Sequence, residues 1–302
     1  CKLNIHMKIF DCFMYFDEEV VLDLRLNILD EYIDYFVVVE SSFTHKGDKR
    51  ELKFNQKKFE KFKKKIIYKV YDEVPKNLEI INDNDNEKVK GNKYIMNALK
   101  RENGQRNYIS EGLIESKDND IILISDVDEI PNLEEIKFEK INEKIFMFRQ
   151  DMFYYKFDLK LPNMVWSGTK GCRKKDLVSP QWLRNIKDKK YSIFRLDTLF
   201  SNKKYSSIKF IEKGGWHFSN IKSAAEIEHK LRSYLHHAEF DEQPLTVNQI
   251  DQIIKQKQAI YDLKVDKTVN KVGTGSKLEK YDFEKLPIYI KKNKKKFDTW
   301  LD

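Results

Sequence analysis

The chain has 302 residues, of which 40% are hydrophobic, 13% aromatic and 35% charged. This length and composition are typical of a folded globular protein with a sizeable core, in one large domain or two small ones. The formal net charge of +8 and the pI near 9.0 favour anionic partners such as nucleotides, nucleic acid, acidic glycans or a membrane surface. Lysines dispersed over a solvated surface would account for the same charge.

Three cysteines, Cys1, Cys12 and Cys172, are odd in number and widely spaced. This pattern fits neither a disulfide framework nor a zinc site, and it indicates a reducing compartment. No apolar run approaches the roughly 18 residues of a membrane span, and no signal peptide is visible. We therefore expect a cytoplasmic protein, with Met7 as its natural start.

The first half of the chain alternates between strand and helix patterns. A helix is expected to follow Asp17 as its N-cap, with Glu18 and Glu19 in the first turn. Residues 76–93 are polar and predict an exposed loop, which leads into a helix at 94–116. Apolar runs predict strands at residues 7–16, 35–41, 63–74 and 121–125. This alternation predicts an α/β fold with a mostly parallel central sheet flanked by helices.

The pattern changes after Pro131. Residues 144–161, "KIFMFRQDMFYYKFDLKL", predict long antiparallel strands, and residues 191–200 predict another strand. Residues 223–240 and 248–263 have the spacing of helices. The end of the chain, "YIKKNKKKFDTW", is basic with flanking aromatics, which is compatible with an anionic surface or with a solvated terminal helix.

A cluster of acids follows the strand expected at 121–125. Asp126 and Asp128 are two residues apart, so on an extended backbone both side chains point to one face and reach one ion. Ligands of such sheets bind beyond the carboxyl ends of the strands. Carboxylates suit Mg²⁺ or Mn²⁺, which takes further ligands from phosphates and water. We therefore expect a metal that bridges the protein to a nucleotide diphosphate, with an acid cluster that caps the next helix as the alternative.

A second conspicuous stretch is "EKGGWHFSN", residues 212–220. Its two glycines permit a positive φ or a close approach of the backbone to a ligand. His217 follows at once and is a candidate for a further metal ligand, although a structural histidine would have the same sequence signal.

Five stretches in this order resemble glycosyltransferase family 17: "FDCFMYFDEEVVLDLRL", "VVVESSFTHKGDKRELKF", "RENGQRN", "IILISDVDEIP" and "GGWHFSN". The resemblance implies a nucleotide-diphospho-sugar fold of the GT-A type and an inverting transfer from UDP-GlcNAc, as in a β-1,4-N-acetylglucosaminyltransferase. It also implies Mn²⁺ (or Mg²⁺) held by Asp126 and Asp128 as the Asp-x-Asp motif, with His217 as the C-terminal metal ligand.

On this basis residues 1–302 form one catalytic domain. Residues 7–130 would be its nucleotide-sugar half, residues 131–240 its acceptor half and residues 241–302 a helical extension. The acceptor is expected to be a glycan, with a bacterial or viral surface glycan more probable than an N-glycan.

Roles can be assigned to individual residues within this expectation. Asp128 is the first choice for a direct metal ligand, while Asp126 would bind metal or ribose. Arg101 and Arg106, on the helix before the motif, are candidates for sharing the phosphate charge. Glu40, at the end of the second strand, is a candidate for contact with uridine.

The catalytic base is less well defined by the sequence. A carboxylate is the usual base for an acceptor hydroxyl. Asp151, one strand beyond the motif, is the first choice, followed by Asp158 and Glu129; Glu129 is also a candidate for orienting the metal ligands.

Other functions remain open at this point. A metal-dependent phosphohydrolase or nucleotidyltransferase would use the same acids, and a relative that only binds glycans would use none of them for turnover. The charge also permits a nucleic-acid-binding protein, but scattered lysines and the lack of a recognised motif mean that no nucleic-acid partner is expected. Peripheral membrane contact through the basic C-terminus is a further expectation.

Overall fold

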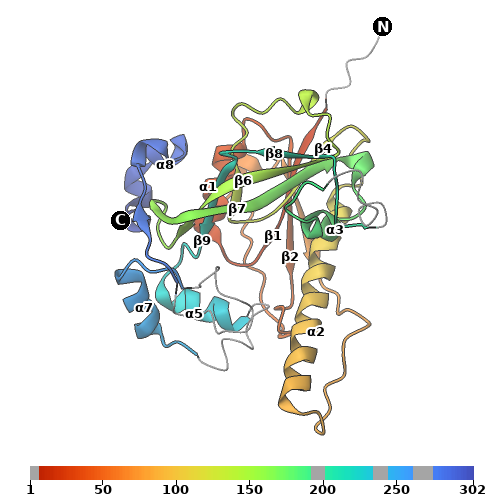
Figure 1. Cartoon of the computed structure of the whole chain (residues 1–302), viewed down its shortest axis with the longest axis vertical. Helices are drawn as coiled ribbons and strands as arrows, with labels where there is room; N and C mark the ends of the chain where they lie inside the picture. The colour runs from red at the N-terminus through yellow and green to blue at the C-terminus, as the bar shows by residue number, and fades with distance from the viewer. Residues whose placement is uncertain (1–6, 192–200, 234–243, 261–274) are drawn as a thin grey trace.

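A computed structural model of the protein describes residues 7–191, 201–233, 244–260 and 275–302. Its centre is a single mixed sheet with helices on both sides (Figure 1). One half of the sheet has the strand order β3-β2-β1-β4, and all neighbours in it are parallel. These strands are β1 (Ile9–Tyr15), β2 (Tyr35–Ser41), β3 (Ile66–Tyr71) and β4 (Ile121–Asp126).

The other half of the sheet is partly antiparallel, so the expectation of a mostly parallel sheet was wrong for this half. β7 runs antiparallel to both β4 and β6, as predicted for the aromatic segment, and β5 runs antiparallel to β9. β8 and β9 pair parallel to β6. The strands are β5 (Glu129–Pro131), β6 (Ile145–Tyr154), β7 (Leu159–Arg173), β8 (Ile208–Ile211), β9 (Gly215–Ser219) and β10 (Glu279–Lys280).

The parallel strands are largely apolar because both faces of β1, β2 and β4 are covered, with Asp11 of β1 and Lys69 of β3 among the exceptions. Successive residues of β4 point to opposite faces, so Ile122 and Ile124 join one core cluster while Ile121 and Leu123 join the other. The first cluster packs against the segment around α3, and the second packs against α1 and the C-terminal segment. This double coverage holds the carboxyl ends of β1, β2 and β4 at one edge of the sheet.

The helices differ from the prediction at their ends. α1 begins at Glu19, and its N-cap is Glu18 rather than Asp17. α2 begins at Glu87, inside the predicted loop, because the Asn86 side chain accepts a hydrogen bond from the backbone N–H of Val89. The α-helices are α1 (Glu19–Leu29), α2 (Glu87–Asn107), α3 (Pro180–Asn185), α5 (Ala224–Ser233), α7 (Val247–Lys255) and α8 (Ile288–Lys292). Short 3₁₀ helices lie at Glu60–Phe62, Tyr108–Gly112, Phe138–Lys140, Lys174–Asp176, Phe283–Lys285 and Lys294–Trp300.

Some predicted elements lie wholly or partly outside the described residues. These are most of the strand at 191–200 and the ends of the helices at 223–240 and 248–263, whose described parts are α5 and α7. Cys12 and Cys172 are buried free thiols, and Cys1 is outside the described residues. In the described part of the chain, every helix is too short or too polar to cross a membrane.

Candidate functional site

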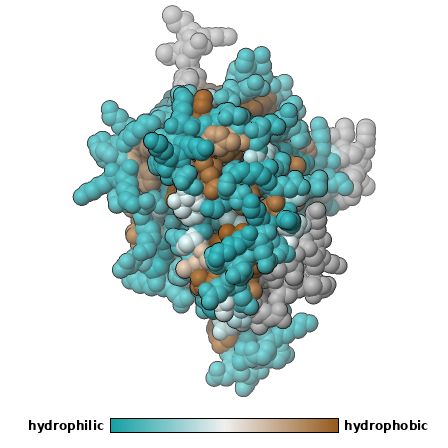
Figure 2. Space-filling model, turned by 90° about the vertical axis from the view of Figure 1, so that its left-hand side faces the viewer, coloured by the Kyte–Doolittle hydropathy of each residue, from teal (hydrophilic) through white to brown (hydrophobic). Residues whose placement is uncertain are grey.

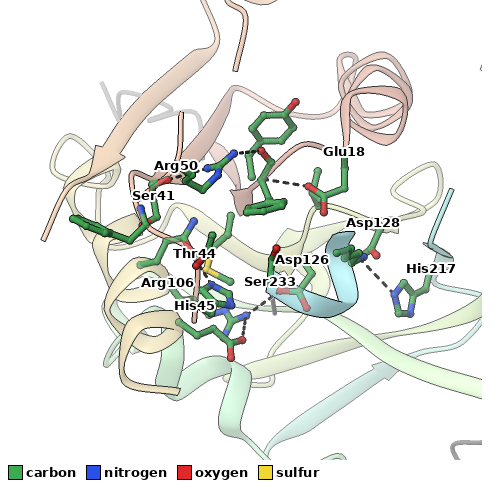
Figure 3. Close-up of a pocket in the computed structure, with 18 residues that line it drawn as sticks. Glu18, Ser41, Thr44, His45, Arg50, Arg106, Asp126, Asp128, His217 and Ser233 are labelled. Carbon is green, nitrogen blue, oxygen red and sulfur yellow. Dashed lines mark hydrogen bonds and ion pairs between the residues drawn. The ribbon is translucent and has the colours of Figure 1, made fainter. Parts of the chain in front are cut away.

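A cavity of about 300 Å³ opens at the carboxyl edge of the parallel strands. β1 ends beside it at Tyr15, β2 at Ser41 and β4 at Asp126, which is where a ligand of such a sheet is expected. Phe16, Phe43 and Arg50 are among the residues that line the cavity. Figure 3 shows Ser41 and Arg50 on one side of it and Asp128 with His217 on the other. The acidic side chains that line it are those of Glu18, Glu102, Asp126 and Asp128.

Asp126 is held by two arginines. Its Oδ1 lies 3.0 Å from Nη2 of Arg106, on α2, and its Oδ2 lies 3.1 Å from Nη2 of Arg184, on α3. Burial raises the pKa of the Asp126 carboxyl, but the two guanidinium groups outweigh this effect and keep its pKa below the ordinary value. The protein itself therefore supplies cations to the first acid of the motif.

Asp128 faces a different partner, because the backbone turns at residues 127–128 instead of staying extended. Its Oδ1 lies 3.5 Å from Nε2 of His217, and both side chains line the cavity. The pairing of β5 with β9 places Glu129 opposite His217, and the backbone N–H of Phe218 donates to the carbonyl of Asp128. Asp126 and Asp128 thus have separate partners, contrary to the expectation of one shared face.

The Asp128–His217 pair is also coupled electrostatically. Burial lowers the pKa of His217, but the Asp128 carboxylate more than compensates and raises it overall. Burial likewise raises the pKa of Asp128, and His217 brings it below its usual range. His217 therefore carries a positive charge to higher pH than a free histidine when no other cation is nearby.

Glu129 lies behind the cavity rather than in its lining. Its carboxylate is fully buried and accepts hydrogen bonds from Arg184, from Nε1 of Trp166 at 2.7 Å and from the backbone N–H of Asp126 at 2.9 Å. The Arg184 contact uses both terminal nitrogens, at 2.7 and 3.0 Å. This geometry fits the expected orienting role of Glu129 and gives no support to its use as a base.

Arg25, on α1, binds the backbone of the acidic turn, by which we mean residues 125–129. The Arg25 side chain is fully buried and forms two hydrogen bonds with Asp11 of β1, at 2.6 and 2.7 Å. It also donates to Oγ of Ser125 and to three carbonyl oxygens of the turn, those of Asp126, Val127 and Glu129, at 3.1, 3.2 and 2.8 Å. Arg25 thus binds carbonyls on both sides of Asp128, and this one guanidinium fixes the path that separates Asp126 from Asp128.

The two glycines of the second motif serve the packing of β9. Gly215 has φ +125°, and a Cβ there would lie 2.2 Å from the carbonyl oxygen of Ile130. A Cβ on Gly214 would lie 2.7 Å from the carbonyl oxygen of Ile211. The predicted positive φ is confirmed at Gly215, and the close approach is to neighbouring backbone. This packing sets the position of His217 two residues later.

A divalent cation fits the Asp128–His217 pair. Two ligands of one ion, each about 2.1 Å from it, lie about 3 Å apart, close to the observed 3.5 Å. Nδ1 of His217 is buried and has no hydrogen-bond partner among the described residues. However, no group of three or more His, Cys, Asp or Glu side chains suited to a metal occurs in the described ranges. The predicted set of Asp126, Asp128 and His217 is therefore not assembled around one point, and a cation would need further ligands from substrate and water.

Two other predicted residues, Glu40 and Arg101, lie away from the cavity lining. Glu40 is fully buried, and its carboxylate accepts from the backbone N–H groups of Lys53 and Phe54 and pairs with Arg50, so it anchors the segment that carries Arg50. Arg101 donates to the carbonyls of His45 and Lys46, at 3.3 and 3.1 Å. It supports the loop that brings His45 to the cavity.

The side chains of Asp151 and His217 point to opposite faces of the sheet. Met152, its neighbour in the chain, is the residue that pairs with His217, and the Asp151 carboxylate lies 2.6 Å from Nζ of Lys160. Asp158, the second candidate base, pairs with Lys280 and accepts from the backbone N–H of Asp302. Neither carboxylate belongs to the cavity lining.

Sequence reasoning missed several residues of the site. Arg184 follows no motif, and Glu18 was read only as part of a helix start. Arg25 and Asp11 did leave a signal, since each interrupts an apolar run. When an apolar run forms part of the core, a charged residue within it is buried together with a partner of opposite charge.

Comparison with known proteins identifies the family of the chain. The sequence model of glycosyltransferase family 17 matches residues 2–302. The chain belongs to glycosyltransferase family 17. Curated relatives include the beta-1,4-mannosyl-glycoprotein 4-beta-N-acetylglucosaminyltransferases of Homo sapiens and Rattus norvegicus, each 28% identical over 156 residues. These alignments cover 48% of this chain but only 26% of either relative, so the chain matches about a quarter of their length.

Proposed function

We propose that this family 17 member is a metal-dependent inverting glycosyltransferase with a GT-A type fold. Its donor would be UDP-GlcNAc and its acceptor a hydroxyl group of a glycan. The observation that carries the proposal is the cavity at the carboxyl edge, whose lining combines aromatic residues and Arg50 with the Asp128–His217 pair. The names of the relatives support the choice of sugar.

The nucleotide would lie along the cavity from the side of Phe43 and Arg50. Phe43 offers an apolar face to a base. The guanidinium of Arg50 is held over the Phe16 ring, 4.2 Å from its centre. Arg106 lines the middle of the cavity beside Asp126, where its positive charge would favour the diphosphate.

A divalent cation, Mn²⁺ or Mg²⁺, would be held by Asp128 and His217. When bound, it supplies Lewis-acid stabilisation of the charge that develops on the leaving diphosphate. Asp126 would keep Arg106 and Arg184 oriented, because both guanidinium groups bind its carboxylate. The acidic turn keeps Asp128 aimed at His217 through the contacts of Arg25 with its backbone.

Glu18 is our assignment for the base, in place of Asp151. Glu18 lines the cavity with Asp128, and burial raises its pKa less than Lys222 and Lys230 lower it, so it is ionised at neutral pH. In the step, the acceptor oxygen forms a bond to the anomeric carbon while the bond from that carbon to the phosphate oxygen breaks. UDP leaves with the electron pair, and Glu18 takes the hydroxyl proton.

The test is UDP release from a panel of UDP-sugars with Mn²⁺, with EDTA, and with the Asp128→Ala variant. We expect release from UDP-GlcNAc that EDTA and the substitution abolish. Asp126→Asn is the matched control, and we expect it to change the Mn²⁺ concentration for half-maximal activity less than Asp128→Asn does. The latter should raise that concentration at least tenfold, because loss of a residue that only supports a metal ligand already costs about 10- to 100-fold in metal affinity.

Two outcomes would contradict the proposal. Phosphate or pyrophosphate in place of UDP would indicate a phosphohydrolase or nucleotidyltransferase. If no UDP-sugar were hydrolysed and UDP with Mn²⁺ failed to raise the melting temperature, the nucleotide-sugar proposal would be wrong.

A further inference from the structure

Two lysine-rich segments that are far apart in the sequence flank α1. Residues 55–65 run along one side, where Lys58 pairs with Glu19 at 2.7 Å and Lys61 pairs with Asp30 at 3.3 Å. Residues 288–302 lie on the other side, where Lys296 pairs with Asp23 at 2.6 Å. A groove lined by residues of both segments and of α1 shows that they meet, and it includes Lys58, Phe59, Lys296, Phe297 and Trp300.

Ion pairs neutralise some of the lysines of these segments, through acids of α1 and of other elements. In the first segment, Lys63 pairs with Glu60 and Lys65 with Asp30, while in the second Lys291 pairs with Glu284. Five further lysines are exposed and form no ion pair with any residue that the structure describes. We call them the basic surface: Lys57, Lys64, Lys292, Lys294 and Lys295.

The surroundings of the basic surface are polar, with a few apolar side chains among them. Figure 2 faces the side that carries α8, and hydrophilic residues cover most of it while hydrophobic ones form small separate patches. Trp300 is half-buried in the groove, and Ile288 on α8 is 59% exposed. Lysines beside a tryptophan suit the interface of a membrane, where the ring lies at the level of the headgroups.

The groove begins beside the proposed active site. Glu18 lines the cavity, while Glu19, the next residue, pairs with Lys58 in the groove. A surface that bound through the groove and its lysines would therefore lie close to the end of the cavity where Glu18 and Asp128 are found.

We propose that the basic surface binds the phosphate headgroups of an anionic membrane. The C-terminal segment alone was expected from the sequence to touch a membrane. The fold adds the segment 55–65, whose Lys58 and Phe59 line one groove with Lys296 and Trp300. Each lysine within a Debye length of an anionic bilayer strengthens binding roughly fivefold. If the proposed transfer is correct, this contact would present a membrane-borne acceptor to the cavity, but the binding itself does not depend on the transfer.

The experiment is co-sedimentation of the full chain with vesicles of phosphatidylcholine alone and with about 30% phosphatidylglycerol, at low and high salt. One variant replaces the basic surface by glutamine: K57Q/K64Q/K292Q/K294Q/K295Q. The control replaces five exposed lysines outside the two segments and so removes the same charge: K88Q/K117Q/K175Q/K187Q/K209Q.

We expect the wild type to bind anionic vesicles, to ignore neutral ones and to be released by salt. The basic-surface variant should bind at least 100-fold more weakly, and the control less than tenfold more weakly. Both variants should keep the wild-type UDP-release rate, which separates this proposal from the proposed function. Equal weakening in the two variants, or no binding to anionic vesicles at low salt, would overturn it. Binding to heparin but not to vesicles would assign the surface to soluble polyanions instead.

Discussion

Arg184 binds the buried carboxylate of Glu129 through both of its terminal nitrogens, at 2.7 and 3.0 Å. The same guanidinium lies 3.1 Å from Asp126, so it joins the acid behind the cavity to the acid that lines it. Burial lowers the pKa of Arg184, but Glu129 and Asp126 raise it well above the ordinary value. Arg184 is thus charged at every accessible pH, and it is a residue of the site together with Asp126 and Glu129.

Replacing Arg184 by methionine should destabilise the fold strongly. Glu129 would be left buried and uncompensated, which costs about 3–5 kcal/mol of unfolding free energy. The stability of Arg184→Lys should lie between that of the wild type and that of Arg184→Met, because an ammonium cannot form the paired contact with Glu129. Urea unfolding measures the loss of unfolding free energy in both variants. Arg149→Met is the control: Arg149 pairs with the partly exposed Asp188, and its loss should cost less than about 1 kcal/mol of ion-pair energy. Equal losses at the two positions would contradict the importance of the buried contact.

Glu18→Gln should remove the base without changing the shape of the cavity. We expect kcat to fall about 10²- to 10⁴-fold while KM for the donor and the stabilisation by UDP with Mn²⁺ change little. Asp151→Asn should stay within about twofold of the wild type, since Asp151 pairs with Lys160 outside the cavity lining and that surface pair is weak. Steady-state kinetics with an acceptor measure kcat and KM of both variants. A large loss of kcat in Asp151→Asn with little change in Glu18→Gln would assign the base to Asp151 instead.

Gly215→Ala should disturb both stability and the position of His217. A Cβ at φ +125° is strained, and it would meet the carbonyl oxygen of Ile130 at 2.2 Å. We expect a loss of at least about 2 kcal/mol and a weaker response to Mn²⁺. Gly91→Ala is the matched control, because Gly91 lies within α2 with open space around it. That change should stabilise the protein by about 0.5–1 kcal/mol. If both variants unfolded alike, the packing account of Gly215 would be refuted.

Lys170 predicts a dependence of stability on alkaline pH. Burial lowers the pKa of Lys170 from 10.5 to about 8, while its Nζ donates to the carbonyls of Arg184 and Ile186. Between these pKa values the unfolded chain binds more protons than the folded one, so raising the pH favours folding.

The unfolding free energy of the wild type should therefore rise from pH 8 to pH 10 relative to that of Lys170→Met, by on the order of 2 kcal/mol. Denaturant unfolding of both proteins across this range measures the difference in unfolding free energy. Taking this difference cancels the titration of the groups that the two proteins share. Parallel curves would show that Lys170 titrates as in solvent.

Much of the parallel half of the sheet could be predicted from the sequence. β1, β2 and β4 are mainly apolar because both faces are buried, and the polar residues that follow or end them mark the edge where the cavity lies. The partly antiparallel half was only partly predictable, since the pairing of β6 with β9 in parallel depends on a connection between distant segments.

The sequence by itself determined which residues of the acidic turn would carry charge at the end of β4, and that a histidine follows a glycine pair. The tertiary structure decided what each charge meets. Arg184 is 58 residues from Asp126 and reaches it only because α3 packs beside β4, while β5 and β9 bring His217 to Asp128. The strands can be recognised from the sequence because the burial of their residues gives a local pattern of apolar side chains. The partners of buried charges depend on how distant segments pack, and no local pattern in the sequence predicts that packing.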